Sequence, residues 1–227
     1  MTQATFHLQV TPNKRNQRRL HHLIDQLFND YSKLLVVRLD LYLGKDYADV
    51  NTYEYMNAAF DRLRNNMRFN RLFEHYITYT ARIEYGSDRR WHYHVVFFFD
   101  GQKVKHDYTL AKLLGKYWIN VITDGLGGYH SANMNKDDYP VFAVGMIVHD
   151  DLQRIANLKE ALKYLVKEEA GEPVRLDAAG KAYRSYRPSS TVLTGSLKYY
   201  VTLWLYLEEI KHGTGAQHST LFSRRFT

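Results

Sequence analysis

The sequence predicts an α/β fold of the α+β type, in which helices pack on a central antiparallel sheet. Four stretches rich in β-branched and aromatic residues are typical of strands, namely 33–43, 77–85, 91–99 and 141–149. Only a short turn separates the second stretch from the third, so these two should pair as an antiparallel hairpin. Apolar residues recur with helical spacing between the strands. We expect these helices to cover one face of the sheet.

The composition fits a single domain over residues 1–227, with its core in about residues 34–190. Hydrophobic residues make up 45% of the chain and aromatic residues 15%, which argues against disorder. The net charge of +7 is compatible with a polyanionic partner, although many basic proteins bind no nucleic acid. Cysteine is absent, which excludes disulfides, thiol chemistry and cysteine-ligated zinc.

Neither a signal peptide nor a membrane-spanning segment is visible in the sequence. Residues 1–10 alternate polar and apolar side chains and lack the apolar core of a signal peptide. No apolar run approaches the roughly 20 residues that a membrane span needs. We therefore expect a soluble, intracellular protein without a membrane partner.

The first helix should begin at Thr11-Pro12, because proline is favoured in the first turn of a helix. Its basic start could contact phosphates or could equally form a solvated face. In the strand at 33–43, side-chain alternation places Arg38 and Asp40 on one face among apolar residues. This pair indicates either a polar site on the sheet or a structural ion pair.

A second helix should follow the loop at 44–50, with Asn51 or Thr52 as its cap. Another helix is expected over 107–122. We interpret the glycine-containing segment 124–140 as a mobile loop, in which two polar residues have no assigned role: His130 and Asn133. No GxxxxGK[ST] motif occurs, so no P-loop ATPase is expected.

A helix capped by Asp150 or Asp151 should run to about Glu169. Tyr164 lies at the edge of its apolar stripe, and Lys167 lies one turn further on the same side. An aromatic residue in such a position is usually a packing residue, so this placement alone does not make Tyr164 catalytic.

The segment 171–188 is polar and basic, with tyrosines between its arginines. Its Arg184, Tyr186 and Arg187 suit stacking and phosphate contacts with single-stranded DNA, although an ordinary surface loop can have the same composition. A closing helix is expected at about 196–210.

Two histidines, His92 and His94, lie two positions apart within the strand at 91–99, so both should point to the same face. Two imidazoles on one face can begin a metal site, although a histidine in a strand is more often a hydrogen-bonded core residue. Glu84 could be a third ligand. A three-residue hairpin loop at 87–89 would place Glu84 opposite His92, whereas a longer loop with a shifted register would send it to the other face.

Three sequence features, taken together, resemble the HUH endonuclease superfamily. The matching features are a carboxylate on one strand, His-hydrophobe-His on its neighbour and Tyr-x-x-Lys on a later helix: Glu84, His92-Tyr93-His94 and Tyr164-Leu165-Val166-Lys167. Tyr93 departs from the pattern, whose middle residue is more often aliphatic. The opening strand at 36–42 also resembles the first strand of the inovirus-type replication initiators, also called the YagK/YfjJ C-terminal domain family.

The resemblance implies an HUH- or RRM-like fold and the activity of a metal-dependent DNA nickase and strand transferase. Glu84, His92 and His94 would bind Mn²⁺ or Mg²⁺. Tyr164 would attack a DNA phosphodiester to give a covalent 5′-phosphotyrosine and a free 3′-OH, and Lys167 would offset charge at the phosphate or lower the pKa of Tyr164.

The same resemblance implies single-stranded DNA, at an origin or a hairpin, as the partner. Nicking would initiate rolling-circle replication of a phage or prophage-type element in the cytoplasm of a bacterial host cell, and a separate helicase would be needed. We expect DNA contacts from two residues of the first strand and three of the later basic segment: Arg38, Asp40, Arg184, Tyr186 and Arg187.

Three other functions are compatible with these residues. A transposase or relaxase of the same superfamily would share the site, and hairpin substrates would favour the transposase. A non-catalytic prophage regulator would bind DNA without forming a covalent adduct. A metal-dependent hydrolase of small substrates would not need Tyr164. Tyr183 and Tyr186 are the second choice for the nucleophile.

Overall fold

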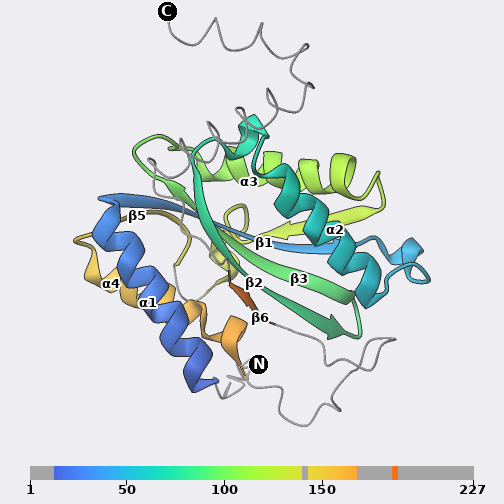
Figure 1. The fold of residues 1–227 in the computed structure, drawn as a ribbon, viewed down its shortest axis with the longest axis horizontal. Helices are drawn as coiled ribbons and strands as arrows, with labels where there is room; N and C mark the ends of the chain where they lie inside the picture. The colour runs from blue at the N-terminus through green and yellow to red at the C-terminus, as the bar shows by residue number, and fades with distance from the viewer. Residues whose placement is uncertain (1–12, 140–142, 168–185, 189–227) are drawn as a thin grey trace, which may run out of the picture. The chain divides into compact units, whose positions relative to one another are not determined.

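The computed structural model describes residues 13–139, 143–167 and 186–188. These residues belong to one compact unit, and their centre is a six-stranded sheet in which every strand pair is antiparallel (Figure 1). The expected antiparallel sheet is therefore confirmed. The strands, in chain order, are β1 (Lys33–Leu43), β2 (Tyr76–Gly86), β3 (Arg90–Asp100), β4 (Gly127–Ser131), β5 (Gly145–Val148) and β6 (Tyr186–Pro188).

β1 organises the sheet because three strands pair with it. The main path runs β4-β1-β3-β2-β6, and β5 also pairs with β1. β4 pairs with the second half of β1, while β5 pairs with its first four residues. The predicted bounds of this strand, 33–43, are the observed ones.

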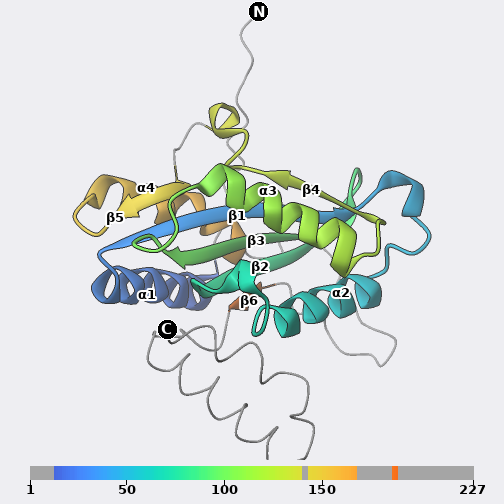
Figure 2. The same ribbon diagram turned by 90° about the horizontal axis from the view of Figure 1, so that it is seen from above.

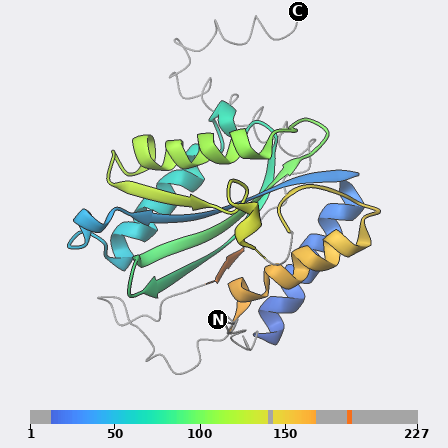
Figure 3. The same ribbon diagram turned by 180° about the vertical axis from the view of Figure 1, so that it is seen from behind.

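Helices cover both faces of the sheet, so the expectation of a single covered face is wrong. The four α-helices are α1 (Lys14–Asp30), α2 (Tyr53–Asn66), α3 (Asp107–Tyr117) and α4 (Leu152–Ala161). Figure 1 shows α2 and α3 on one side of the sheet and α1 and α4 on the other, and Figure 3 shows the same arrangement from behind. In Figure 2, α1 and α4 lie together at the β5 end of the sheet.

The physical reason is that the first half of β1 is apolar on both faces. Leu35 and Val37 join the main core, which also holds Phe60 of α2 and Leu114 of α3. Val36 points to the opposite face and is also fully buried. Apolar side chains on both faces of a strand require cover on both sides.

Two helix starts are set by caps. Asn13 caps α1 by accepting a hydrogen bond from the backbone N–H of Asn16, so the described helix begins at Lys14. The expected start at Thr11-Pro12 lies outside the described residues. Thr52 caps α2, as one of the two predicted choices. The predicted start of the helix at 107 is observed, and a π-helical turn extends it over Trp118–Ile122.

The prediction of a loop over 124–140 is wrong for β4, which is an edge strand of the sheet. Its glycines permit close packing on β1: a Cβ atom added to Gly128 would lie 2.4 Å from the ring of Tyr42. A composition rich in glycine and polar residues therefore concealed a strand whose conformation depends on its neighbour.

The last predicted elements are shorter in the structure. The strand expected at 141–149 is seen as β5, with residues 140–142 outside the described part. Asp151 caps α4 as predicted, but regular helix ends at Ala161 and a 3₁₀ turn, Lys163–Val166, follows. The helix expected at 196–210 lies outside the described residues. No described helix is long and apolar enough to span a membrane.

Candidate metal centre and tyrosine site

The hairpin between β2 and β3 has the register that brings the three candidate ligands together. Gly86 pairs with Arg90, which leaves a three-residue loop at 87–89, and Glu84 therefore lies directly opposite His92. His94 lies two residues further on the same face. Of the two registers considered from the sequence, the structure has the one that puts the carboxylate beside both imidazoles.

The ligand atoms of Glu84, His92 and His94 all lie within 4.8 Å of one another. Metal bonds from nitrogen and oxygen ligands are about 2.0–2.2 Å long, so donors around one ion are at most about 4.4 Å apart. Only a small closure is therefore needed to bind an ion. A mixed imidazole and carboxylate set suits Mn²⁺ and tolerates Mg²⁺.

Hydrogen bonds fix the orientation of both imidazole rings. Nδ1 of His94 lies 2.6 Å from Oδ1 of Asp40, and Nδ1 of His92 lies 2.9 Å from the carbonyl oxygen of Arg90. Because both partners only accept, each Nδ1 carries the proton, and Nε2 of the neutral ring presents its lone pair. A histidine ligand with its other nitrogen held by an oxygen is the usual arrangement in metal sites.

The two oxygens of Glu84 have different surroundings. Oε2 lies 3.6 Å from Nε2 of His94, on the side of the candidate ligands. Oε1 forms ion pairs with Nε of Arg82 at 2.7 Å and with Nζ of Lys167 at 2.9 Å. Oε2 is therefore the oxygen that can bind a metal ion, while Oε1 is held by the two cations.

The electrostatic balance keeps both carboxylates ionised. Burial would raise the pKa of Asp40, but its interactions with His94, Arg38 and Arg89 outweigh burial and lower it to about 2. Burial would likewise raise the pKa of Glu84, yet His94 and Lys167 hold it well below its ordinary range.

The two histidines have opposite shifts. Burial lowers the pKa of His94, but Asp40 and Glu84 outweigh this effect and raise it above its ordinary value. Burial lowers the pKa of His92, and the neighbouring His94 acts in the same direction. At neutral pH His92 is therefore the neutral imidazole of the pair, whereas His94 retains a proton more readily.

Tyr164 lies against the candidate metal centre. Its ring contacts the ring of His94 edge-to-face, with the centroids 5.3 Å apart, and the guanidinium of Arg38 lies 4.5 Å from its ring centre. The hydroxyl is buried and makes no hydrogen bond within the described part of the chain. Burial raises the pKa of Tyr164 above its ordinary value, although Arg38 opposes the shift.

Tyr164 lies in the 3₁₀ turn, and Lys167 is the residue that follows the turn, where a continuous helix was expected. The turn nevertheless brings both residues to the same site, because Tyr164 meets His94 and Lys167 meets Glu84. The Tyr-x-x-Lys spacing thus places the two side chains on the two ends of the ligand set.

The first strand contributes Arg38 and Asp40 to this site. Asp40 is 6% exposed and contacts His94, Arg38 and Arg89, so in the structure it fixes the orientation of the His94 ring. Arg38 stacks between the rings of Tyr139 and Tyr164, at 5.2 and 4.5 Å. Contact with DNA stays a prediction for both residues.

The predicted DNA contacts of the later basic segment fall at the limit of the described chain. Arg184 lies outside it. The backbone of Tyr186 and Arg187 forms β6, in which Tyr186 pairs with Arg82 and Arg187 with Ala81. The segment predicted as a loop therefore returns to the sheet next to the strand that carries Glu84.

Sequence reasoning missed Arg82 and Tyr139. Arg82 contacts the backbone of Leu165 and Lys167, and Tyr139 contacts Arg38, so these contacts join distant parts of the chain that only the folded structure brings together. Asn133, which had no assigned role, binds the backbone of β1: its side chain accepts from the N–H of Arg38 and donates to the carbonyl of Val36. It holds the start of the polar half of β1.

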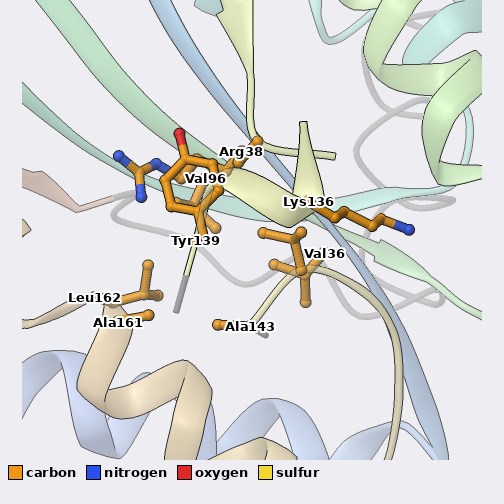
Figure 4. A pocket seen from close by; sticks show the side chains of 10 residues that line it. Val36, Arg38, Val96, Lys136, Tyr139, Ala143, Ala161 and Leu162 are labelled. Atoms are coloured by element: carbon orange, nitrogen blue, oxygen red, sulfur yellow. The ribbon is translucent and has the colours of Figure 1, made fainter. Parts of the chain in front are cut away.

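A small cavity of about 30 Å³ lies beside Arg38, which lines it (Figure 4). Val36 and Val96 of the sheet and Leu162 at the end of α4 line it, and Figure 4 shows Tyr139 at its rim. Its volume holds about one water molecule, so it is too small for a nucleotide base as it stands.

The fold and the side-chain cluster define an α+β domain with a candidate metal centre beside a tyrosine whose hydroxyl is buried. The model of the YagK/YfjJ C-terminal domain family matches residues 4–176, and the chain belongs to this family. No curated protein and no solved structure matches the chain.

Proposed function

We propose that this chain is a metal-dependent HUH endonuclease of the inovirus replication-initiator type, which nicks and rejoins single-stranded DNA through Tyr164. The observation that carries the proposal is the meeting of Tyr164 and Lys167 with Glu84 and His94, which lie 70 or more residues earlier in the sequence. A tyrosine beside two imidazoles and a carboxylate fits attack on a phosphodiester.

The residues divide the work as follows. Glu84, His92 and His94 would hold Mn²⁺ or Mg²⁺, which when bound withdraws charge from the scissile phosphate. The oxygen of Tyr164 forms a bond to phosphorus while the bond from phosphorus to the 3′-oxygen breaks. The phenol proton is balanced by the proton that the departing 3′-oxygen gains, which leaves a 5′-phosphotyrosine and a 3′-OH.

Arg38 and Lys167 supply positive charge at the two sides of the attacking group. The Arg38 guanidinium on the ring of Tyr164 favours the phenolate over the phenol. Lys167 lies on Glu84, close enough to the ligand set to offset charge on a bound phosphate. Because the energy of the phosphoester is retained in the adduct, attack by the 3′-OH rejoins the strand.

The biological role that fits this chemistry is initiation of rolling-circle replication of a phage or prophage-type element, with single-stranded DNA as substrate and a separate helicase. A transposase or relaxase would use the same residues. An origin-like strand that is nicked without a hairpin favours the initiator, whereas a strict need for a hairpin favours the transposase.

One observation favours a second candidate, a non-catalytic DNA-binding regulator. Arg82 and Lys167 already neutralise Glu84 by ion pairs, so the ligand set is electrostatically satisfied without an ion. A regulator would retain this polar cluster as structure. It would bind DNA and form no adduct at any metal concentration.

Adduct formation separates these candidates. The purified chain is incubated with Mn²⁺ or Mg²⁺ and labelled single-stranded oligonucleotides, both random-sequence and hairpin-forming, and then resolved in SDS. We expect a metal-dependent band shift that Tyr164→Phe abolishes. Tyr108→Phe is the control, because Tyr108 is 51% exposed on α3. The absence of any adduct with the wild type, or its persistence in Tyr164→Phe, would overturn the assignment.

A further inference from the structure

Arg82 lies at the junction between the metal ligands and the segment that carries Tyr164. It lies in β2 two residues before Glu84, and it is the pairing partner of His94 in β3. The residue is 2% exposed, although arginine is rarely buried without a specific partner. Its buried position therefore calls for an explanation in terms of what the guanidinium holds.

The guanidinium holds two parts of the site at once. Nε forms the 2.7 Å ion pair with Oε1 of Glu84. Nη1 donates to the carbonyl of Lys167 at 2.9 Å and to that of Leu165 at 3.3 Å. One planar group thus joins the carboxylate of Glu84 to two backbone carbonyls, one and three residues after Tyr164.

These carbonyls belong to the end of a 3₁₀ turn, where backbone oxygens lack partners within the turn itself. The carbonyl between them, that of Val166, accepts from the backbone N–H of Asn13 at 2.7 Å. Three successive carbonyls are therefore fixed from outside, two of them by Arg82. The turn that presents Tyr164 is held to the sheet through this side chain.

We propose that Arg82 is a positioning residue, which sets the placement of Tyr164 relative to the metal-binding carboxylate of Glu84. The inference rests on the proposed function for its catalytic consequence, but the placement itself can be measured without catalysis. A lysine in its place would keep the charge and lose the planar fork, so it could not bind the carboxylate and both carbonyls together.

Arg82→Lys should separate metal binding from chemistry. Because lysine keeps a positive charge near Glu84, the Kd for Mn²⁺ should stay unchanged. The rate of adduct formation should fall by about 100-fold, because a displacement near 1 Å of a reacting group costs about that much. The KM for DNA should not change.

The matched control is Arg154→Lys. Arg154 also donates to two backbone carbonyls, those of Val144 and Met146, and these belong to a segment that carries none of the proposed site residues. We expect it to lose some thermal stability and to keep the wild-type rate. A parallel loss of rate in both variants would show that Arg82 acts only through stability.

The placement is tested directly by fluorine NMR on protein that contains 3-fluorotyrosine, with the Tyr164 signal assigned by its absence in Tyr164→Phe. Mn²⁺ should broaden this signal strongly in the wild type and less in Arg82→Lys. Equal broadening in both would overturn the inference even if nicking is observed. Strong broadening in the wild type that is reduced in the variant would support it even if no DNA is cleaved.

Chemical rescue of Arg82→Ala by free guanidinium is a further test. Arg82→Ala should regain part of its rate, and of its Tyr164 broadening, when guanidinium is added at non-denaturing concentration, since the added ion can occupy the vacated fork. Absence of rescue together with a wild-type broadening pattern would contradict the proposal. If the wild type binds no Mn²⁺ at all, both the proposed function and this inference fail.

Discussion

Removal of the buried hydroxyl of Tyr164 should affect the proposed activity and the stability of the fold in different ways. It has no hydrogen-bond partner among the described residues, and a buried unpaired polar group destabilises a fold. Tyr164→Phe should therefore unfold at the same temperature as the wild type or a higher one, with a gain of up to about 1–3 kcal/mol. Thermal unfolding monitored by circular dichroism checks this.

A marked loss of stability in Tyr164→Phe would mean that the hydroxyl has a structural partner, and the placement described above would then be wrong. The same variant should retain Mn²⁺ affinity, because its ring keeps the edge-to-face contact with His94. A polar group kept in place at a cost in stability is typical of a functional residue.

Asp40 holds the side chain of His94, one of the candidate ligands. Its carboxylate holds Nδ1 of His94 at 2.6 Å and so fixes the ring that presents Nε2. Asp40→Asn keeps the shape but loses the charge, so we expect Mn²⁺ affinity to fall by about 10–100-fold. Calorimetric titration measures the change, and Asp61→Asn on the exposed outer face of α2 is the control.

At the scale of elements, the sequence predicted the hairpin of β2 and β3. It did not predict how this hairpin pairs with the other strands. Strand alternation predicted that His92 and His94 share a face, and the loop length left two registers open for Glu84, of which the structure has the one that places it opposite His92. The pairing of Asp40 with His94 joins residues 54 positions apart in sequence and could not be derived from either strand alone. Arg82 was missed for the same reason.

β4 is the element whose sequence was most misleading. Its two glycines look like loop residues, yet Gly128 is needed because the ring of Tyr42 fills the space of a Cβ atom. Gly128→Ala should destabilise the protein by about 1–3 kcal/mol through overpacking. Gly86→Ala is the control, since its added Cβ would meet only His92 at an ordinary 3.5 Å. Urea unfolding of both variants would refute the assignment if they proved equally stable.

At the scale of the whole molecule, the two halves of β1 have different roles. Its first half is apolar on both faces and lies between two helix pairs, which makes it the rigid centre of the fold. Its second half carries Arg38 and Asp40 into the candidate site. The candidate ligands lie on β2 and β3, and β1 supports them from the strand with the most partners. Rigid elements hold reactive groups more accurately than loops do.

The interactions of His94 with Asp40 and Glu84 make the stability of the protein depend on pH, and a bound metal ion should reverse the direction of this dependence. Without metal, the raised pKa of His94 means that its interactions with Asp40 and Glu84 stabilise the fold fully below the unfolded pKa of about 6.5. That stabilisation is lost as pH rises through the higher folded pKa, by at most about 1.4 kcal/mol per pH unit. The lowered pKa of His92 acts only below about pH 6.5, so it does not disturb this window.

With Mn²⁺ the sign changes, because the ion requires the lone pair on Nε2 and therefore the release of the His94 proton. Affinity, and with it stability, should rise with pH over the same window in which the metal-free protein weakens. Thermal unfolding from pH 6.5 upward, in EDTA and in Mn²⁺, measures both slopes, and His94→Gln should flatten both. Parallel slopes in the two buffers would show that His94 binds no ion, since a ligand that must lose its proton cannot leave the pH dependence unchanged.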